Sequence, residues 1–143
     1  MDTLNNLISF SKKEGILNSK NSIAEFKGNV SEESKNSILM VLLHAADIAN
    51  QGRVFKIAKN LSFKCLEEFF NQGDSEKALG LPISYLCDRS SVSIPSSQIG
   101  FISHVVYPFF EKIIEIFPGL NEILVNLKQN ELEWKNLAES NKL

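Results

Sequence analysis

The sequence predicts an all-α fold, and three observations lead to it. Apolar residues recur at three- and four-residue steps along most of the chain after residue 33, which is the period of a helix. No segment alternates apolar and polar residues in the manner of a half-buried strand. Glycine and proline fall mainly between the periodic segments, where they end helices. The 143 residues, of which 43% are hydrophobic and 22% charged, suit one globular domain.

The first part of the chain is predicted to hold three segments. Asp2–Lys13 is expected to be a helix, and Glu14–Glu32 a polar connection of low order. From Ser34 to Asn50 the sequence SKNSILMVLLHAADIAN places Val41 and Ala45 on an apolar stripe, and most of its other positions are apolar too. A helix that is apolar nearly all round is buried on most sides, so we expect this one to be covered by its neighbours.

The middle of the chain is predicted to be a second strong helix followed by a loop. The helix covers Phe55–Gln72, with Gly73 placed to cap its C-terminus and Asp74 to start a short helical turn. The stretch from Gly80 to Ser97 is rich in serine and holds two prolines. We therefore expect a loop there.

Two helices are predicted to complete the chain. Pro95 suits the first turn of a helix that runs to Phe117, bends at Pro108 and ends at the following Pro-Gly pair. A last amphipathic helix, Asn121–Leu137, turns its apolar residues inward and its lysines, glutamates and asparagines outward. The multi-helix array that results has no internal repeat.

Charge and cysteine content exclude several classes of protein. The net charge of −2 does not favour a nucleic acid polymer or an anionic membrane as partner. The longest apolar run, Ile38–Ala46, is far shorter than the roughly 20 residues that a membrane span needs. Cys65 and Cys87 lie in no CxxC spacing, so we expect reduced thiols and a cytoplasmic protein.

One candidate site is the pair His44 and Asp47. Three positions apart on a helix, the two side chains share a face inside the most apolar segment of the chain. A buried carboxylate requires a cation, a metal ion or several donors. Asp47 is therefore either a metal ligand or a core residue satisfied by His44 or by a backbone amide, and the spacing alone leaves both readings open.

A second candidate site is Gln98 with Phe101. One helical turn apart, the amide and the ring share a face, and Gly100 between them permits close backbone approach. An amide with a donor and an acceptor, beside a stacking ring, is a minimal reader of a purine. A glutamine near a helix start, followed by core phenylalanines, is the alternative.

Other polar residues are expected to serve structure. Glu67 and Glu68 are predicted to form a solvated helix edge, from which one can reach a basic residue. Asp88 and Arg89 are predicted to form an ion pair that orders the loop, and His104 is expected to be a core or surface histidine. The chain holds no glycine-rich phosphate loop and no GxSxG or HExxH motif.

Four sequence segments occur one after another along the chain. They are HAADIAN, CLEEFFNQGDSEKALGLPIS, CDR and SIPSSQIGFISHVVYPFFE. Together they resemble the C-terminal part of the catalytic domain of class I 3',5'-cyclic nucleotide phosphodiesterases, in order from about Leu42 to Phe110 and more loosely on both sides. The resemblance implies that residues 1–143 are the C-terminal portion of an all-helical, HD-type catalytic domain.

The resemblance also implies a reaction and a set of site residues. The family opens the cyclic phosphate of cAMP or cGMP to a 5'-monophosphate at a site with two divalent metals, usually zinc and magnesium. By position, Asp47 matches a metal ligand, Gln98 the glutamine that hydrogen-bonds the purine, and Phe101 an aromatic half of the base clamp. The further matched positions near the nucleotide are Asn50, Cys65, Leu66, Phe69 and Leu86.

The chain departs from the family pattern at specific places. The family asparagine is normally followed by proline, whereas here Asn50 precedes Gln51, and Cys65 stands where a larger isoleucine or valine is usual. The HNxxH motif, with its proton-donating histidine, and the HD pair occur nowhere in the sequence; in the family they lie before the point where it begins. No catalytic residue is therefore assigned, and the chain alone is expected to be inactive.

Two functions thus remain open for the chain. It is either part of a phosphodiesterase that needs a complementary N-terminal half, or an inactive helical scaffold derived from that domain, which docks on another protein. A sensor that binds the nucleotide without hydrolysis is less favoured, since few donors remain for the phosphate. The preference between cAMP and cGMP is also open, because an amide can face either way.

Overall fold

A computed structural model describes residues 32–140 as a series of helices. In chain order these are α2 (Glu32–Ile48), η3 (Ala49–Gly52), α3 (Phe55–Ala78), α4 (Ile94–Phe101), η4 (Ile102–Val106), α5 (Tyr107–Ile116), η5 (Pro118–Leu120) and α6 (Asn121–Ser140). Residues 32–140 contain no strand, which confirms the predicted all-α class. The helix predicted at Asp2–Lys13, and all but the last residue of the connection after it, lie outside the described residues.

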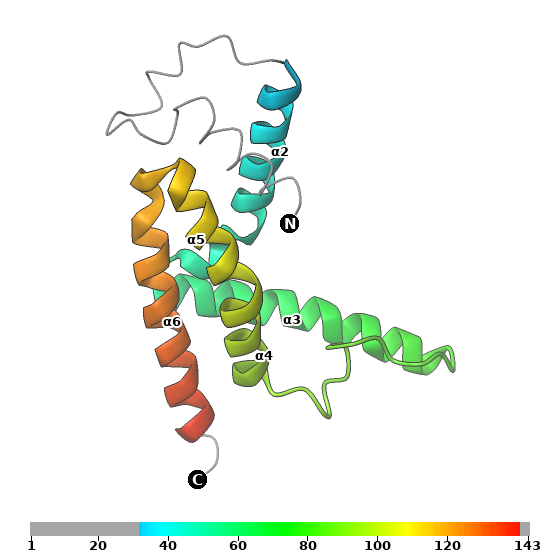
Figure 1. Ribbon diagram of the computed structural model, residues 1–143. Coiled ribbons are helices and arrows are strands. Elements are labelled where there is room, and N and C mark those ends of the chain that lie inside the picture. Colours follow the sequence, from blue (N-terminus) through cyan, green and yellow to red (C-terminus); the bar gives the residue numbers. More distant parts are fainter. Residues whose placement is uncertain (1–31, 141–143) are drawn as a thin grey trace.

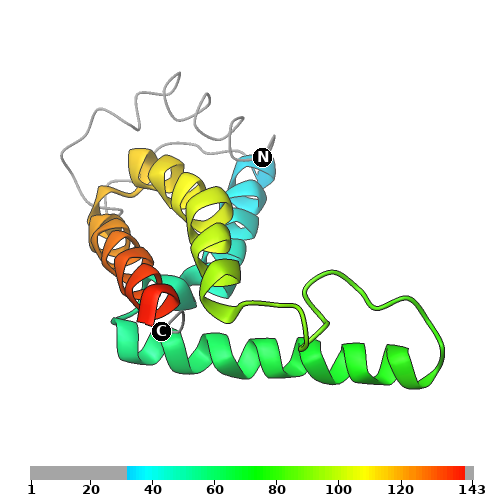
Figure 2. The ribbon, with the colours of Figure 1, turned by 90° about the horizontal axis from the view of Figure 1, so that it is seen from below.

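The helices form a group that one long helix crosses on one side. Helices α2, α5 and α6 lie roughly along one direction, and α3 runs across that direction (Figure 1). Seen from below, the C-terminal half of α3 extends beyond the group, and the loop after it returns along the same helix (Figure 2). Helix α4 continues through η4 into α5 as one rod, which packs against α6.

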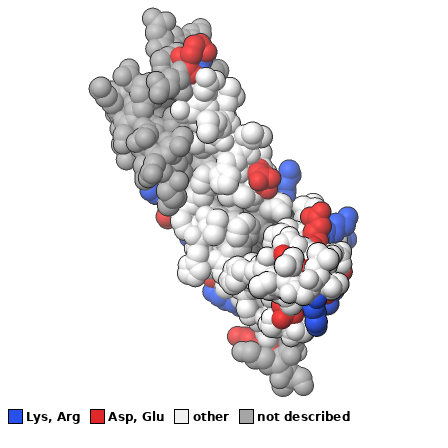
Figure 3. Space-filling model, turned by 90° about the vertical axis from the view of Figure 1, so that its right-hand side faces the viewer, with Lys and Arg blue, Asp and Glu red and all other residues white. Residues whose placement is uncertain are grey.

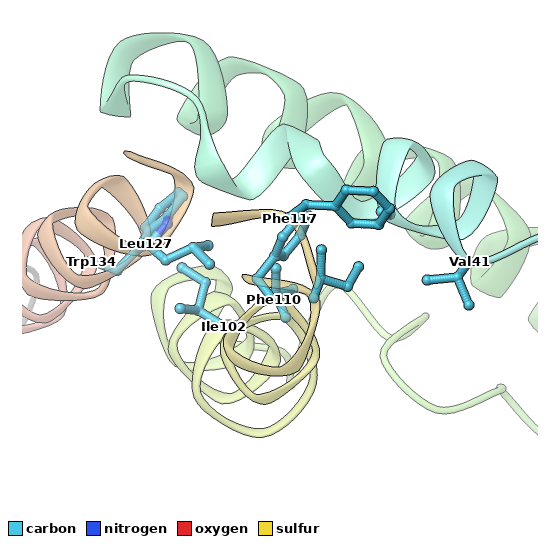
Figure 4. Close-up of a cluster of buried hydrophobic side chains, with 9 residues drawn as sticks. Val41, Ile102, Phe110, Phe117, Leu127 and Trp134 are labelled. Atoms are coloured by element: carbon cyan, nitrogen blue, oxygen red, sulfur yellow. The ribbon is translucent and has the colours of Figure 1, made fainter. Parts of the chain in front are cut away.

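A cluster of buried apolar side chains fills the space between this rod and its neighbours (Figure 4). Ile102, Ile113, Leu127 and Trp134 have no exposed surface. Because these positions belong to the predicted apolar stripes of the last two helices, the structure confirms the helical period there. The cluster consists of Val41, Ala45, Ile102, Val106, Phe110, Ile113, Phe117, Leu127 and Trp134.

Helix α2 is much less covered than its composition predicts. Val41 and Ala45 are buried, but Leu39, Met40 and Leu43 are 62%, 63% and 75% exposed. The prediction that this helix is buried on most sides is therefore wrong for residues 32–140. The reason is that the described elements reach α2 along one side only, and Figure 3 shows an uncharged surface over it.

Helix α3 continues through Gly73 instead of ending there. A Cβ atom on Gly73 would lie 2.0 Å from the carbonyl oxygen of Cys87, so the missing side chain permits close packing of the loop. The helix ends instead at Ala78. Gly80 has a φ of 70°, and the bond from Leu81 N–H to the carbonyl oxygen of Glu76 closes a Schellman cap.

The rod of α4 and α5 begins earlier and turns differently from the prediction. Helix α4 starts at Ile94, with Ser93 as N-cap and Pro95 in the first turn as predicted. The prediction placed a bend at Pro108, whereas the structure has a π-helical turn, η4, just before that proline. Proline has no N–H to donate to the carbonyl oxygen four residues earlier, and a wider turn just before it accommodates that loss.

None of the helices within residues 32–140 is both long and apolar enough to cross a membrane.

Candidate nucleotide site

Three buried amide and hydroxyl side chains meet where η3 reaches α3 and α4. Gln51, Ser62 and Gln98 are 3%, 1% and 7% exposed. The Nε2 atom of Gln51 donates to Oε1 of Gln98 at 3.1 Å and to Oγ of Ser62 at 3.0 Å. The predicted purine reader Gln98 is thus held from behind by Gln51, a residue 47 positions earlier in the chain.

Helix α6 holds η3 in place through two asparagines. Asn130 Nδ2 donates to the carbonyl oxygens of Gln51 and Arg53 at 2.6 and 2.7 Å, and Asn126 Nδ2 donates to that of Gly52 at 2.9 Å. Asn130 is 1% exposed, so the prediction that the asparagines of this helix face outward is wrong at this position. It faces inward because turn carbonyls without helical partners need donors.

Within residues 32–140, three buried polar atoms near this junction have no hydrogen-bond partner. They are Oδ1 of Asn50, Oε1 of Gln51 and Nε1 of Trp134. Buried polar atoms are paired in the great majority of cases. An unpaired acceptor on Asn50, beside an anchored glutamine, is therefore a place where a donor from a ligand would be stabilised.

Phe101 and Gln98 lie one turn apart on α4, as the spacing predicts. Phe101 is partly buried and packs against the apolar cluster. A Cβ atom on Gly100 would meet nothing within 4 Å, so the close backbone approach expected there is not made by this chain. The amide and the ring are therefore placed together, and the glycine between them faces open space.

His44 and Asp47 lie on α2, but neither is buried. Both are exposed, and the His44 ring packs edge-on against Phe109 at 5.0 Å. The prediction of a carboxylate inside an apolar core is wrong, because α2 is covered on one side only. No group of three or more histidine, cysteine or acidic residues within residues 32–140 could hold a metal ion, so the described residues do not by themselves fit a metal.

The matched nucleotide positions on α3 lie on two of its faces. Leu66 is buried, whereas Cys65 and Phe69 are exposed and follow each other one turn apart. Partial desolvation of the Cys65 thiol by its neighbours raises its pKa, and the negative charge of Glu68 adds to that rise. Leu86, in the loop beside α3, is partly buried and has a φ of 66°.

The ion pair predicted between Asp88 and Arg89 is wrong. Arg89 instead bonds to Asp74 at 2.7 Å and to Glu67 at 3.4 Å, which ties the loop to α3. Asp88 accepts hydrogen bonds from the hydroxyl and the N–H of Ser90, which lower the pKa of its carboxyl. The predicted reach of one helix-edge glutamate to a basic residue is confirmed at Glu67, and His104 is exposed.

Sequence reasoning missed Gln51, Ser62 and Asn130. Asn130 had a signal, since it stands three residues after Leu127 and four before Trp134, on the apolar stripe of its helix. A polar residue in an apolar stripe indicates a buried hydrogen bond. Gln51 and Ser62 had no such local signal, because Gln51 bonds to Ser62 and Gln98 over separations of 11 and 47 residues in the sequence.

The fold is that of helical phosphodiesterase domains. A solved phosphodiesterase domain, from a rhodopsin fusion protein of the choanoflagellate Salpingoeca rosetta, aligns with a TM-score of 0.75 and 30% identity over 99% of this chain and 44% of that one. The sequence pattern of the 3'5'-cyclic nucleotide phosphodiesterase family matches residues 2–127. The chain belongs to this family.

The chain is also similar to curated phosphodiesterases that are much longer than it is. It is 38% identical over 101 residues to the probable 3',5'-cyclic-AMP phosphodiesterase pde-4 of Caenorhabditis elegans, covering 70% of this chain. It is 44% identical over 82 residues to a dual specificity calcium/calmodulin-dependent 3',5'-cyclic nucleotide phosphodiesterase 1B of Bos taurus, covering 57% of this chain. The chain spans 15% of the length of each of these relatives.

Proposed function

We propose that this chain supplies the purine-binding side and one metal ligand of a site that hydrolyses cAMP, cGMP or both to 5'-monophosphates. One observation carries the proposal: Gln98 is buried, its Oε1 is anchored by Gln51, and its Nε2 makes no hydrogen bond within residues 32–140. An amide fixed at one end and unpaired at the other is prepared to bind a ligand. Residues 1–143 then form the C-terminal portion of a catalytic domain.

Each nucleotide contact has a specific role in this proposal. Gln98 hydrogen-bonds the purine edge, and the ring of Phe101, one turn later, stacks on the base. Asn50 offers its unpaired Oδ1 near the nucleotide. Cys65, Leu66 and Phe69 line the site from α3, and Leu86 lines it from the loop.

Asp47 is the single metal ligand that we assign to this chain. Its exposed carboxylate is free to join ligands from elsewhere in the complete domain, and zinc and magnesium are the metals we expect. Such metals would polarise the phosphate and activate water when bound. Since the described residues hold no metal cluster and the chain has no HNxxH motif, we assign no step of the reaction to this chain alone.

A binding titration tests the assignment of the base contact. The ¹⁵N-labelled chain is titrated with cAMP and with cGMP, and amide shift changes are expected around Gln98 and Phe101. Gln98→Ala should weaken binding about tenfold, the effect of one hydrogen bond between buried groups. Gln129→Ala, an exposed glutamine change on α6, is the matched control. Equal binding by wild type and Gln98→Ala would remove Gln98 from the site.

An activity assay tests the metal assignment. We expect no measurable hydrolysis of cAMP or cGMP by the chain alone with zinc and magnesium present. Addition of a complementary N-terminal portion of the domain should restore turnover, and Asp47→Asn should then abolish it. Chelator-sensitive turnover by the chain alone would contradict the proposal.

A second function, an inactive interaction module, is favoured by the exposed apolar face of α2. Leu39, Met40 and Leu43 are each more than 60% exposed, and contiguous apolar surface marks interaction sites. Size-exclusion chromatography with light scattering, on wild type and on a Met40→Lys, Leu43→Lys variant, tests it. A monomeric wild type with a sharp thermal transition would count against a required partner.

We also place the protein in the cytoplasm. Cys65 and Cys87 are both free thiols, which agrees with a reducing compartment. The same compartment holds cyclic nucleotide signalling, to which the proposed reaction belongs.

A further inference from the structure

Helix α3 and its N-terminal flank separate basic from acidic residues. Residues 53–66 hold four basic residues and no acidic one, whereas residues 67–76 hold four acidic residues and no basic one. The macrodipole of a helix favours the opposite order, with acidic residues near the N-terminus and basic ones near the C-terminus. The charge order of α3 therefore does not stabilise the isolated helix. The basic residues are Arg53, Lys56, Lys59 and Lys64, and the acidic ones are Glu67, Glu68, Asp74 and Glu76.

One side of α3 is exposed along its whole length. Figure 2 shows the group of other helices on one side of α3 and none of the described elements on the opposite side. Exposed residues follow one another on that side at separations of three, four or eleven positions, which are close to whole numbers of helical turns. We call this row the outer strip, and it includes Val54, Ile57, Leu61, Lys64, Glu68 and Leu79.

The outer strip is apolar toward its ends. Val54 and Leu79, the residues that cap α3, are 59% and 74% exposed. Ile57 and Leu61, in the first half of the helix, are 48% and 38% exposed. Exposed apolar side chains in one continuous row are typical of a surface that contacts another molecule.

The middle of the outer strip holds two opposite charges that do not pair with each other. Lys64 and Glu68 are both exposed, and neither makes an ion pair with any residue from 32 to 140. A lysine four positions before a glutamate is the less favourable order for a pair within one helix. Both charges are therefore available to a partner.

A second copy of α3 matches this strip when it runs in the opposite direction. The middle of α3 falls between residues 66 and 67. With two copies turned end to end about that point, Lys64 of each copy faces Glu68 of the other, and Val54 faces Leu79. The basic half of each helix then lies along the acidic half of the other. A two-fold symmetric interface requires this kind of self-complementary surface.

Other partners match only part of the strip. An acidic protein would suit the basic half alone, and an anionic membrane would be repelled by the acidic half. Arg89 of the same chain already neutralises Glu67 and Asp74 beside the strip, so Glu68 is the acid left for the partner. A second copy uses both halves.

We propose that the outer strip of α3 is the interface between two antiparallel copies of this chain. The inference goes beyond the proposed function, because it requires neither a nucleotide nor a metal. It also places the second copy beside the proposed nucleotide positions Cys65 and Phe69, which directly follow Lys64 and Glu68 in the sequence.

Analytical ultracentrifugation with exchanged charges tests the interface. Wild type should be a dimer at submillimolar concentration, and molar salt should weaken it by screening the charges. Lys64→Glu and Glu68→Lys should each weaken dimerisation at least about tenfold, because each change turns two attractive pairs into two repulsive ones. An equal mixture of the two variants should form dimers again, since every facing pair is then of opposite charge.

A second mixture tests the antiparallel direction. The double variant Lys64→Glu, Glu68→Lys should dimerise with itself as wild type does. It should not form mixed dimers with wild type, because antiparallel mixing sets lysine against lysine and glutamate against glutamate. In a parallel pair the mixed dimer would be the favoured one, and that result would overturn the proposal.

Two control variants locate the interface on α3. Lys135→Glu makes the same charge change at an exposed lysine of α6 and should leave the dimer intact. Met40→Lys, Leu43→Lys, on the exposed face of α2, should leave it intact as well. Circular dichroism confirms that each variant is folded.

Three results would each overturn the proposal. They are a monomeric wild type at submillimolar concentration, no dimer in the mixture of Lys64→Glu with Glu68→Lys, and a dimer that only the α2 variant disrupts. None of these results depends on nucleotide binding, so the proposed function is judged separately by its own titration.

Discussion

The turn η3 and the loop of residues 79–93 are each packed on a helix at a glycine, but the groups that hold them differ in burial. Asn130 and Asn126 hold η3 from inside the fold. The loop is held on α3 at the surface by Arg89 and by Glu76. Removing a hydrogen-bond partner costs more free energy at a buried polar group than at an exposed one. Mutation should therefore destabilise the attachment of η3 much more than that of the loop.

The largest effect is expected from Asn130→Asp. The new carboxylate would face the carbonyl oxygens of Gln51 and Arg53 without a donor, and breaking buried polar pairs in this way costs about 3–5 kcal/mol. Urea unfolding measures the loss. Asn136→Asp, the same change at an exposed position of α6, should stay within about 0.5 kcal/mol of wild type. Similar values for both variants would show that the buried attachment is unimportant.

Alanine substitutions at Gly73 and Gly52 should lower the stability by different amounts, because the new Cβ atoms meet different atoms. Gly73→Ala brings a Cβ atom to 2.0 Å from backbone at Cys87, whereas Gly52→Ala meets the movable Cγ2 of Ile123 at 2.6 Å. Gly73→Ala should destabilise by about 1–3 kcal/mol and Gly52→Ala by less.

Thiol labelling locates the damage in Gly73→Ala. The Cys87 side chain is buried, so its reaction with a thiol reagent should accelerate when the loop moves away. Gly100→Ala, with open space around the new Cβ atom, should stabilise by up to about 1 kcal/mol. A Gly73→Ala variant whose Cys87 is labelled at the wild-type rate would show that the close packing at Gly73 does not hold the loop in place.

A smaller effect is expected at the surface ion pairs. Arg89→Met removes the bonds to Asp74 and Glu67 and should raise the Cys87 labelling rate a few-fold, because exposed ion pairs contribute little. Molar salt should reproduce part of this increase in wild type, since it screens exposed charges. Arg53→Met, at another exposed arginine, is the control, and an equal rate increase there would disprove a specific role for Arg89.

The smallest effect is expected at Glu76, and it depends on pH. The carboxylate accepts bonds from the N–H and hydroxyl of Ser84 and from Gln72, which lower the pKa of Glu76, the Ser84 N–H contributing most. A lowered pKa means that the contact stabilises the loop at neutral pH and is lost as the pH falls through that value.

The Ser84 amide proton reports this titration. Its chemical shift should move upfield as Glu76 is protonated, with a midpoint below the ordinary glutamate value. Glu76→Gln should leave the shift flat, and Ser84→Ala should move the midpoint part of the way back. A midpoint at the ordinary value in wild type would contradict the assignment.

The sequence predicted the helices and most of the buried stripe, because those depend on local period. Leu127 and Trp134 are buried as their spacing indicates. The sequence did not predict the exposure of α2, since residues 32–140 bury only one side of this nearly all-apolar helix. It also failed at Gly73, because a helix-ending glycine and a close-packed one look alike until the distant Cys87 is placed beside it.

The candidate site was predictable to a similar degree. Gln98 and Phe101 came from spacing and resemblance together, and the structure places them on one face of α4. The residue that anchors Gln98 was not predicted, because the bond from Gln51 to Gln98 joins residues far apart in sequence. Local patterns find residues that face a ligand more readily than residues that orient them.

The π-helical turn Ile102–Val106 has a consequence for the whole rod. In an α-helix each residue advances about 100° around the axis, so the wider turn changes the phase of everything after it. The residues around Gln98 and those around Phe110 can therefore face different directions within one continuous rod. Deleting one residue between 102 and 106 would turn the π-helical turn into α-helix and rotate α4 relative to α5. Either Gln98 could then keep its hydrogen bond or Phe110 its buried position, but not both.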